Sequence, residues 1–600
     1  MKQGDFYKEN RSRKINLINQ PNNLVFFVTM IFLLIFGRLV HLQILQGSKF
    51  KRLSEENRIR VVSSPPIRGR LLDINGITLA DNRLVYSLIV QPHLIKKSEW
   101  PLLAENLSQL LDLDLKKIHE LFDSGIINNQ FSITLMAEMS DEQIIRFKEN
   151  ETLLYGAQVH LELIRYYPFK TVASHVLGYT QYITSNEYKL LANKGYKIRD
   201  RIGRAGIESV FEHHLRGKWG GEMLEVDATG KIQRSLGYQS PKAGKDLILT
   251  LDLRLQNAAE KALEGKKGGA IVALDPHTGA IKAMASRPSF DPNYFTKLFT
   301  TQKEYEDIFL ASDLPLLSRA LNAYDPGSTW KVVTGMAGME SGKYPPNVLL
   351  DTKPCIQYGG HCFPEHNGLG FGKIGYEDAF RVSSNTFFYQ VGVGVGSEEL
   401  YEAAIKLGFY SRTGIEISNE ESKGFVGNKE WAEKGRGWGK PGTTPWIPED
   451  IASASIGQAV VQVTPLQLAR AYAVFANGGY LITPHLVEGK VDWLSNQFRT
   501  KVDIKPSTLQ KIREGLRKVA ISGTGRTIHF GELTLPPVAG KTGTAEDSTG
   551  GSDHAWFACF APFESTEIVV VAFAQNTPGG GSVHALPMAR EVLEVWYKGL

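Results

Sequence analysis

The chain has 600 residues, of which 42% are hydrophobic, 10% aromatic and 22% charged, and its formal net charge is +5. This length predicts two or three folded units rather than a single core. The weak positive charge gives no reason to expect a nucleic-acid partner, and three cysteines are too few for a disulfide scaffold.

One segment near the N-terminus is long and apolar. Residues 24–45 read LVFFVTMIFLLIFGRLVHLQIL, and as a helix they would span about 33 Å, enough to cross a bilayer core. A buried soluble helix is the alternative, but no amphipathic stripe is visible and no small-residue cleavage site follows. Residues 1–23 carry an excess of Lys and Arg, which favours a cytoplasmic tail. We therefore expect a single-pass anchor in the cytoplasmic membrane, with residues 46–600 on the extracytoplasmic, periplasmic side.

Residues 46–245 predict an elongated α+β domain that carries no catalytic constellation. The DING turn at 73–76 lies between two short apolar runs, as in a hairpin. Residues 141–159 predict a helix followed by a strand, and 203–231 predict a helix, a glycine-rich turn and a strand pair. We expect this segment to act as a pedestal, or dimerisation-type domain, that lifts a catalytic domain from the membrane and docks partners.

Residues 246–600 predict a second α+β domain. GGAIVALDPHTGAIKAMAS at 268–286 predicts a β-hairpin, and two more strand-like segments lie at 554–562 and 566–576, before a C-terminal helix. Between these β segments the chain is mostly helical, from about 313 to 520. Strands from both ends of one region predict a single antiparallel sheet flanked by helices.

The segment YDPGSTWKVV, Tyr324–Val333, places a primary amine three residues after a hydroxyl group. Ser328 is a poor nucleophile without a base, and Lys331 would lie on the same face of a helix that begins near Ser328. Lysine acts as a base only when its amine is neutral, which burial near other cations can bring about. The helix N-terminus would also offer a backbone N–H to an oxyanion. Taken alone, this spacing is common in solvated surface pairs.

Two further motifs follow in order, S-x-N at 383–385 and K-T-G at 541–543. This is the motif order of serine acyl-enzymes that react with β-lactams. Residues 541–546 come just before the predicted strand pair, and the glycine at 543 would let a ligand backbone approach a strand closely. Three ordered motifs make chance a poor explanation.

On these motifs the chain resembles the penicillin-binding proteins, specifically the high-molecular-mass class B D,D-transpeptidases. PSFDPN, VTPLQLA and SHVLGY are similar to the elongation-type subgroup, penicillin-binding protein 2, and the septal (division) subgroup is the second candidate. The resemblance implies a five-stranded antiparallel sheet flanked by helices, plus a helical subdomain, within 246–600. It covers nearly the whole chain beyond the anchor, through RGRLLDINGITLADN, YPFKTVASHVLGY, GIESVFEHHLRGKWG, SRPSFDPNYF, NAYDPGSTWK, IGQAVVQVTPLQLA and VAGKTGTAE.

The resemblance implies an enzyme that cross-links peptidoglycan stem peptides during cell-wall elongation and that β-lactams acylate. Ser328 would attack the D-Ala–D-Ala carbonyl and Lys331 would take its proton. Ser383 would relay protons with electrostatic support from Lys541. Asn385 would bond the substrate amide and Lys331. The backbone N–H groups of Ser328 and Thr544 would form the oxyanion hole. The implied substrate-binding residues are Asn385, Lys541, Thr542, Gly543 and Thr544, with the two threonines holding the terminal carboxylate.

The resemblance implies no metal or organic cofactor. It does imply two kinds of partner, a polytopic glycosyltransferase of the shape, elongation, division and sporulation (SEDS) family and proteins of the elongation complex. Two other functions stay open. One is a D,D-carboxypeptidase or β-lactamase-type hydrolase with the same nucleophile, and the other is an acylated scaffold with little turnover.

Cys355, His361, Cys362 and His366 lie close together in the sequence CIQYGGHCFPEH. A Cys355–Cys362 disulfide, free thiols and a zinc site are the three interpretations. Some relatives bind zinc near here through a cysteine at the middle position of S-x-N, where this chain has a serine. Cys559 is expected to be a small buried hydrophobic residue.

Overall fold

The structure is a computed structural model that describes ten ranges of the chain. These ranges are 21–49, 59–127, 132–197, 200–226, 232–297, 302–433, 446–489, 497–531, 534–546 and 552–598. They group into two compact units, one of Met1–Pro66 with Lys218–Lys242 and one of Ile67–Gly217 with Ala243–Leu600. The larger unit thus holds most of the expected pedestal as well as the expected catalytic domain, and a boundary at 245/246 stays a prediction.

The smaller unit contains the apolar helix and a three-stranded antiparallel sheet. Helix α1 (Pro21–Val40) continues into a π-helical turn, η1 (His41–Leu45). In the part of the chain that the structure describes, Leu24–Leu45 is the one helical segment long and apolar enough to cross a membrane. The sheet has the order β1-β8-β9, formed by β1 (Ile59–Ser64), β8 (Gly220–Val226) and β9 (Ile232–Gln239). The first strand predicted after the glycine-rich turn lies within residues 203–231, whereas its partner β9 begins directly after that range, at Ile232.

In the larger unit, residues 67–217 and the short strand at 247–248 build a sheet around one long strand, β3 (Thr78–Val90). The DING turn joins β2 to β3, and Gly76 has a φ of +83°, which favours glycine. Three helices bury their apolar faces against β3 and β4. The other strands are β2 (Leu71–Leu72), β4 (Ile133–Met136), β5 (Ala157–Tyr166) and β10 (Leu247–Ile248). The helices are α3 (Trp100–Leu111), α4 (Leu115–Ile127) and α5 (Asp141–Glu149).

A buried ionic cluster joins three segments of this region. Glu208, in helix α8 (Gly206–Val210), is fully buried and accepts hydrogen bonds from Arg68 Nε and Arg165 Nε, each at 2.6 Å. Arg68 also donates to Glu212 at 2.7 Å. Buried charges are tolerated when each has partners. Because Arg68 precedes β2 and Arg165 lies in β5, these ion pairs hold α8 against the sheet around β3.

Residues 246–600 are organised on one antiparallel sheet with the order β12-β11-β23-β22-β21. The predicted hairpin and strand pair are all present, and the two ends of the region meet where β11 pairs with β23. K-T-G precedes the strand pair, as predicted, and itself forms the fifth strand at the sheet edge. The strands are β11 (Gly268–Leu274), β12 (Ile281–Arg287), β21 (Ala539–Ala545), β22 (His554–Ala561) and β23 (Ile568–Gln575).

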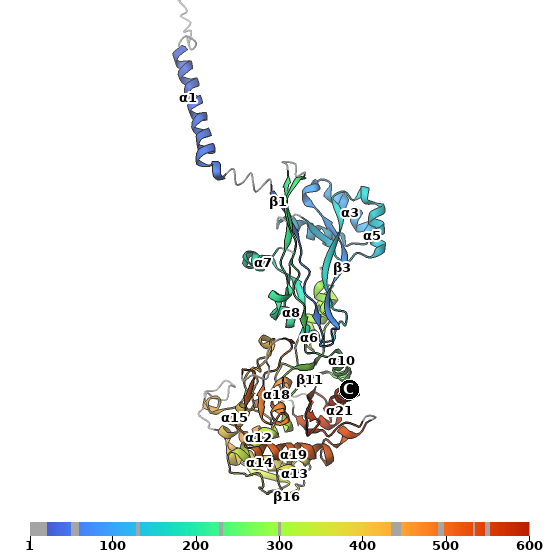
Figure 1. Cartoon of the computed structure of the whole chain (residues 1–600), viewed down its shortest axis with the longest axis vertical. Helices are drawn as coiled ribbons and strands as arrows, with labels where there is room; N and C mark the ends of the chain where they lie inside the picture. Colours follow the sequence, from blue (N-terminus) through green and yellow to red (C-terminus); the bar gives the residue numbers. More distant parts are fainter. Residues whose placement is uncertain are drawn as a thin grey trace, which may run out of the picture. The chain divides into compact units, whose positions relative to one another are not determined.

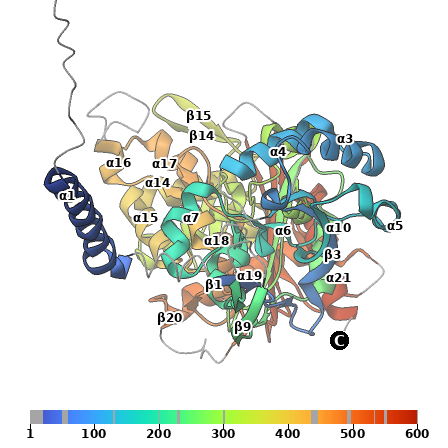
Figure 2. The ribbon, with the colours of Figure 1, turned by 90° about the horizontal axis from the view of Figure 1, so that it is seen from above.

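Alternate residues of these strands serve two apolar cores. One face packs against α10 (Leu253–Ala262) and α21 (Ala585–Lys598), which lie side by side (Figure 2). The other face packs against α18 (Pro465–Ala476) and the helical subdomain. Cys559 is buried on the first of these faces, as predicted.

Helices are the main regular structure in the middle of the chain, but loops and short two-stranded sheets take up more of it than predicted. In Figure 1 α13 and α19 lie side by side, with α12 and α14 near them. The other helices of this middle part are α12 (Lys331–Glu340), α13 (Tyr376–Val382), α14 (Asn385–Val395), α15 (Ser397–Lys406), α16 (Lys429–Glu433), α17 (Pro448–Ser455) and α19 (Pro506–Ser522). The hairpin that matters for the site is β14 (Cys355–Tyr358) with β15 (His361–Pro364).

Candidate active site

The serine of S-x-x-K lies in a 3-10 turn rather than in the α-helix that the sequence predicted to begin there. The turn η7 spans Gly327–Trp330, and the α-helix begins at Lys331. Gly327 has a φ of +52°, and a Cβ on it would lie 2.3 Å from Thr544 O. Because Gly327 has no side chain, the serine turn can lie directly against strand β21. Within the described residues, the Ser328 hydroxyl makes no hydrogen bond.

Lys331 is fully buried, and its amine is held by the S-x-N motif. Its Nζ donates to Asn385 Oδ1 at 2.6 Å, to Ser383 O at 2.7 Å and to Ser383 Oγ at 3.3 Å. Burial lowers the pKa of Lys331 to about 7, and the negative charge of Glu365 opposes that shift. At neutral pH a large fraction of the amine is therefore uncharged, as a general base requires.

The S-x-N motif lies at a junction between two helices. Ser383 ends α13 with a φ of +57°, a left-handed conformation that reverses the chain direction. Ser384 is the N-cap of α14, and its Oγ accepts from Phe387 N at 3.2 Å. This turn places the backbone oxygen of Ser383 and the side chain of Asn385 on the same amine.

The K-T-G lysine is the second buried amine of the site. Lys541 Nζ donates to Ser383 Oγ at 2.8 Å and to Thr542 O at 3.1 Å. Burial lowers its pKa well below the usual value, and the nearby charge of Lys331 lowers it further. Ser383 Oγ thus lies between two lysine amines, which is the position that a proton relay would need.

The rest of β21 forms the edge beside the serine turn. Thr542 Oγ1 and Thr524 Oγ1 are 2.6 Å apart, and the Thr544 side chain is exposed. A Cβ on Gly543 would lie 2.9 Å from Thr329 Cγ2 and 3.0 Å from Pro326 O. Gly543 is therefore needed for close packing against the serine turn, whereas the sequence suggested close approach of a ligand.

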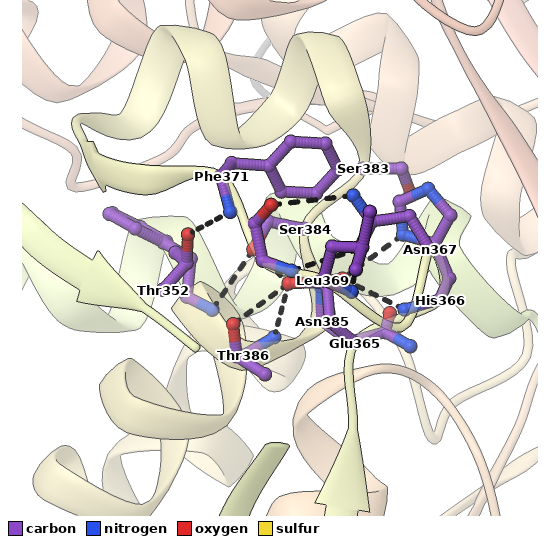
Figure 3. A network of polar contacts seen from close by, with 12 residues as sticks. Thr352, Glu365, His366, Asn367, Leu369, Phe371, Ser383, Ser384, Asn385 and Thr386 are labelled. Atoms are coloured by element: carbon purple, nitrogen blue, oxygen red, sulfur yellow. Dashed lines mark hydrogen bonds and ion pairs between the residues drawn. The ribbon is translucent and has the colours of Figure 1, made fainter. Parts of the chain in front are cut away.

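All eight predicted site residues lie in this one region, on η7, α12, the α13–α14 junction and β21. Sequence reasoning missed Thr524 and Glu365. Glu365 accepts hydrogen bonds from three consecutive residues, Ser384 to Thr386, and Figure 3 draws this network. No periodicity or motif connects Glu365 to the S-x-N segment, so only the fold could reveal the contact.

The cysteine–histidine segment forms a disulfide-closed hairpin. Cys355 and Cys362 are bonded to each other across β14–β15, so the free-thiol interpretation and a zinc site that uses these thiolates are wrong. Hairpin strand β15 ends directly before Glu365, so the disulfide closes the element that carries this carboxylate.

Comparisons with known protein families and relatives support the enzyme class that this site geometry indicates. Residues 269–594 match the family model "Penicillin binding protein transpeptidase domain", and residues 63–249 match the penicillin-binding protein dimerisation domain. The peptidoglycan D,D-transpeptidase MrdA of Acinetobacter baumannii is 32% identical over 600 residues, covering 95% of this chain and 86% of the relative.

Two similar solved structures come from protein complexes. Penicillin-binding protein 2 of Helicobacter pylori, solved with MreC, aligns with a TM-score of 0.79 at 25% identity, covering 90% of this chain and 99% of that one. A chain of a peptidoglycan synthase complex aligns with a TM-score of 0.70 at 31% identity, covering 96% of this chain and 98% of that one. The chain therefore belongs to the class B penicillin-binding proteins, in the elongation-type penicillin-binding protein 2 group of peptidoglycan D,D-transpeptidases.

Proposed function

We propose that Ser328 is the nucleophile of the transpeptidase and Lys331 its base. The observation that carries this assignment is the buried Lys331 amine, whose pKa is lowered to about 7 and which lies one turn after the serine. A neutral amine accepts the Ser328 proton as its Oγ attacks the D-Ala–D-Ala carbonyl. An ester forms between Ser328 and the donor peptide, and the terminal D-Ala leaves with a proton passed through Ser383.

The oxyanion of this step is bound by the backbone N–H groups of Ser328 and Thr544. Packing of the serine turn against β21 through Gly327 and Gly543 supports this pairing. Loss of one preorganised oxyanion-hole donor costs such a step about 2.7–4 kcal/mol. Thr542 and Thr544 bind the terminal carboxylate of the donor, and the buried Lys541 supports Ser383.

The second step uses an amine from a neighbouring stem peptide. This amine attacks the Ser328 ester, the new amide bond forms the cross-link, and the Ser328 hydroxyl is restored. A β-lactam imitates the donor, and its ring opens onto Ser328 to leave a stable ester.

Residues 1–23 are proposed as a cytoplasmic tail, 24–45 as the anchor, 46–245 as the pedestal and 246–600 as the transpeptidase domain in the periplasm. The apolar helix and the basic tail support this orientation. The partners proposed are a SEDS-family glycosyltransferase and elongation-complex proteins. Support comes from similarity to penicillin-binding protein 2 solved with MreC and to a chain of a peptidoglycan synthase complex.

Intact-mass spectrometry of the full-length protein with benzylpenicillin tests the nucleophile. The wild-type protein is expected to gain one penicillin mass, and Ser328→Ala is expected to gain none. Ser341→Ala, at the C-terminal end of α12, is the matched control and should be acylated like the wild type. Equal acylation of Ser328→Ala and the wild type would refute the assignment.

A further inference from the structure

Glu365 is a buried carboxylate that the proposed chemistry does not use. Only 2% of the residue is exposed. Its Oε2 accepts from Ser384 Oγ at 2.6 Å, Thr386 Oγ1 at 2.8 Å and Thr386 N at 3.1 Å. Its Oε1 accepts from Asn385 N at 2.7 Å and contacts the backbone and ring nitrogens of His366 at 3.1 and 3.0 Å (Figure 3).

The carboxylate occupies the N-terminus of helix α14. Backbone N–H groups in the first turn of a helix have no partner within the helix, and the helix dipole favours an anion there. Burial alone would raise the pKa of Glu365. The hydrogen bonds from His366, Ser384, Asn385 and Thr386 outweigh burial and lower the pKa to about 2. The group is therefore an anion at neutral pH.

The residues that Glu365 holds are also the residues that hold the proposed base. Asn385 gives its backbone N–H to Glu365, while its side-chain oxygen accepts from Lys331 Nζ. Ser383 precedes this turn directly and contacts Lys331 through two oxygens. A shift of the helix start would move all three acceptors of the Lys331 amine together.

Two charged groups act on the Lys331 amine from the elements packed around it. The Glu365 anion, after β15, favours the protonated amine, and the Lys541 amine lies on β21 across Ser383. The described contacts of Glu365 are with the helix start and His366, and none is with Ser328 or Lys331. Glu365 therefore acts on Lys331 through its charge and through the helix start that it holds, and not by direct contact.

We propose that Glu365 is a positioning residue of this active site. Its carboxylate, carried on the disulfide-closed β14–β15 hairpin, fixes the N-terminus of α14 so that Ser383 and Asn385 hold Lys331 in place. The proposal rests on the proposed roles of Lys331, Ser383 and Asn385. The alternative is a carboxylate that only stabilises the fold.

The test compares Glu365→Gln with the wild type in the full-length protein. A glutamine keeps the size but lacks the charge, and it turns one acceptor into a donor that faces other donors. The second-order rate constant for acylation by a fluorescent penicillin is expected to fall about 10- to 100-fold, as for a misplaced catalytic group. Glu416→Gln is the matched control, because Glu416 also accepts two backbone N–H groups, from Leu486 and Val487.

The pH profile reports whether the Glu365 charge acts on the Lys331 amine, and the acylation rate reports whether Glu365 positions it. Acylation requires the neutral Lys331 amine, so its rate rises with pH through the pKa of Lys331. Removal of the Glu365 anion lowers the pKa of Lys331 further. The part of the curve in which the rate rises with pH, here called the acid limb, should therefore move to lower pH in Glu365→Gln. Glu365→Asp keeps the charge and should leave the limb near its wild-type position. A lower melting temperature with an unchanged rate and an unchanged limb would overturn the proposal.

A milder variant covers the case in which Glu365→Gln does not fold. Thr386→Val removes one hydroxyl donor and keeps both shape and charge. It should slow acylation about 3- to 10-fold without moving the pH limb, and a wild-type rate would count against the proposal. Lys331→Ala tests the underlying function separately. Lys331→Ala could lose acylation while Glu365→Gln and Thr386→Val both behave like the wild type. That result would refute the positioning role of Glu365 and leave the proposed function in place.

Discussion

At the scale of single residues, the site depends on two buried amines that share one hydroxyl group. Lys331 and Lys541 both contact Ser383 Oγ, at 3.3 and 2.8 Å. Two charges this close would repel in a buried environment, so protonation of one amine disfavours protonation of the other. The neutral amine that the reaction needs is therefore a consequence of burial and pairing, which no local sequence pattern displays.

The lowered pKa of Lys331 predicts how acylation depends on pH. Because only the uncharged amine can accept the Ser328 proton, the rate should level off above pH 7 and fall about 10-fold per pH unit well below it. The measurement is the rate of penicillin acylation between pH 5.5 and 8.5, with circular dichroism at each pH to verify folding. A rate that does not change over this range would show that Lys331 is not the base.

A side chain at position 543 is expected to lower the stability of the protein and to slow acylation. A Cβ there would meet Thr329 Cγ2 at 2.9 Å and Pro326 O at 3.0 Å, which forces β21 away from the serine turn. Gly543→Ala should cost about 1–3 kcal/mol of unfolding free energy through overpacking and slow acylation at least 10-fold. Chemical denaturation and acylation kinetics measure the two effects.

The control for Gly543→Ala is a crowded glycine elsewhere in the same sheet. A Cβ on Gly269 of β11 would lie 2.4 Å from Phe573 O, away from the serine turn. Gly269→Ala should therefore be destabilised to a similar degree, while its folded fraction is acylated at the wild-type rate. If both variants lost acylation equally, the geometric role of Gly543 would be wrong.

At the scale of elements, the sequence predicted the strands better than it predicted the contacts among them. Alternating or continuous apolar runs identified β11, β12, β22 and β23, because burial of both sheet faces leaves a local signature. The strand with K-T-G was expected only as a segment before the pair, since glycine and threonine carry little apolar signal. The Glu365 network joins a hairpin to a helix start, and such long-range contacts have no period along the chain.

Removal of the Cys355–Cys362 disulfide is expected to loosen only the hairpin that carries Glu365. A loop this short loses about 2–3 kcal/mol of stabilisation when the bond is removed. Cys355→Ser with Cys362→Ser should therefore slow acylation less than Glu365→Gln does, because the carboxylate remains. Acylation rates with and without reductant measure this effect.

The disulfide experiment has an internal control. Reductant should slow the wild-type enzyme to the rate of the double-serine variant, and it should leave that variant unchanged. Cys559 is buried and burial raises the pKa of its thiol, so it should not contribute to the response. A wild-type rate that withstands complete reduction of the bond would contradict the prediction.

At the scale of the whole molecule, the pedestal and the catalytic sheet share one apolar core in the larger compact unit. Val176, Leu177 and Ile207 are almost fully buried in the same cluster as strands β11 and β23. Polar contacts also cross this region, since Glu260 accepts from Ala173 N and Glu420 accepts from Gly206 N. The chain matches two separate family models, at 63–249 and 269–594. In the structure, however, most of both matched regions pack together in one compact unit.

This shared core predicts that the catalytic domain depends on its pedestal. A fragment of residues 246–600 would expose the part of this cluster that Val176, Leu177 and Ile207 cover, and each large apolar side chain uncovered costs roughly 1.5–3 kcal/mol. A fragment of 59–600, which lacks only the tail, the anchor and the segment after it, should melt and acylate like the full chain in detergent. The 246–600 fragment should melt many degrees lower and lose penicillin binding over time. Equal melting temperatures and equal acylation of the two fragments would mean that the transpeptidase domain folds independently of the pedestal.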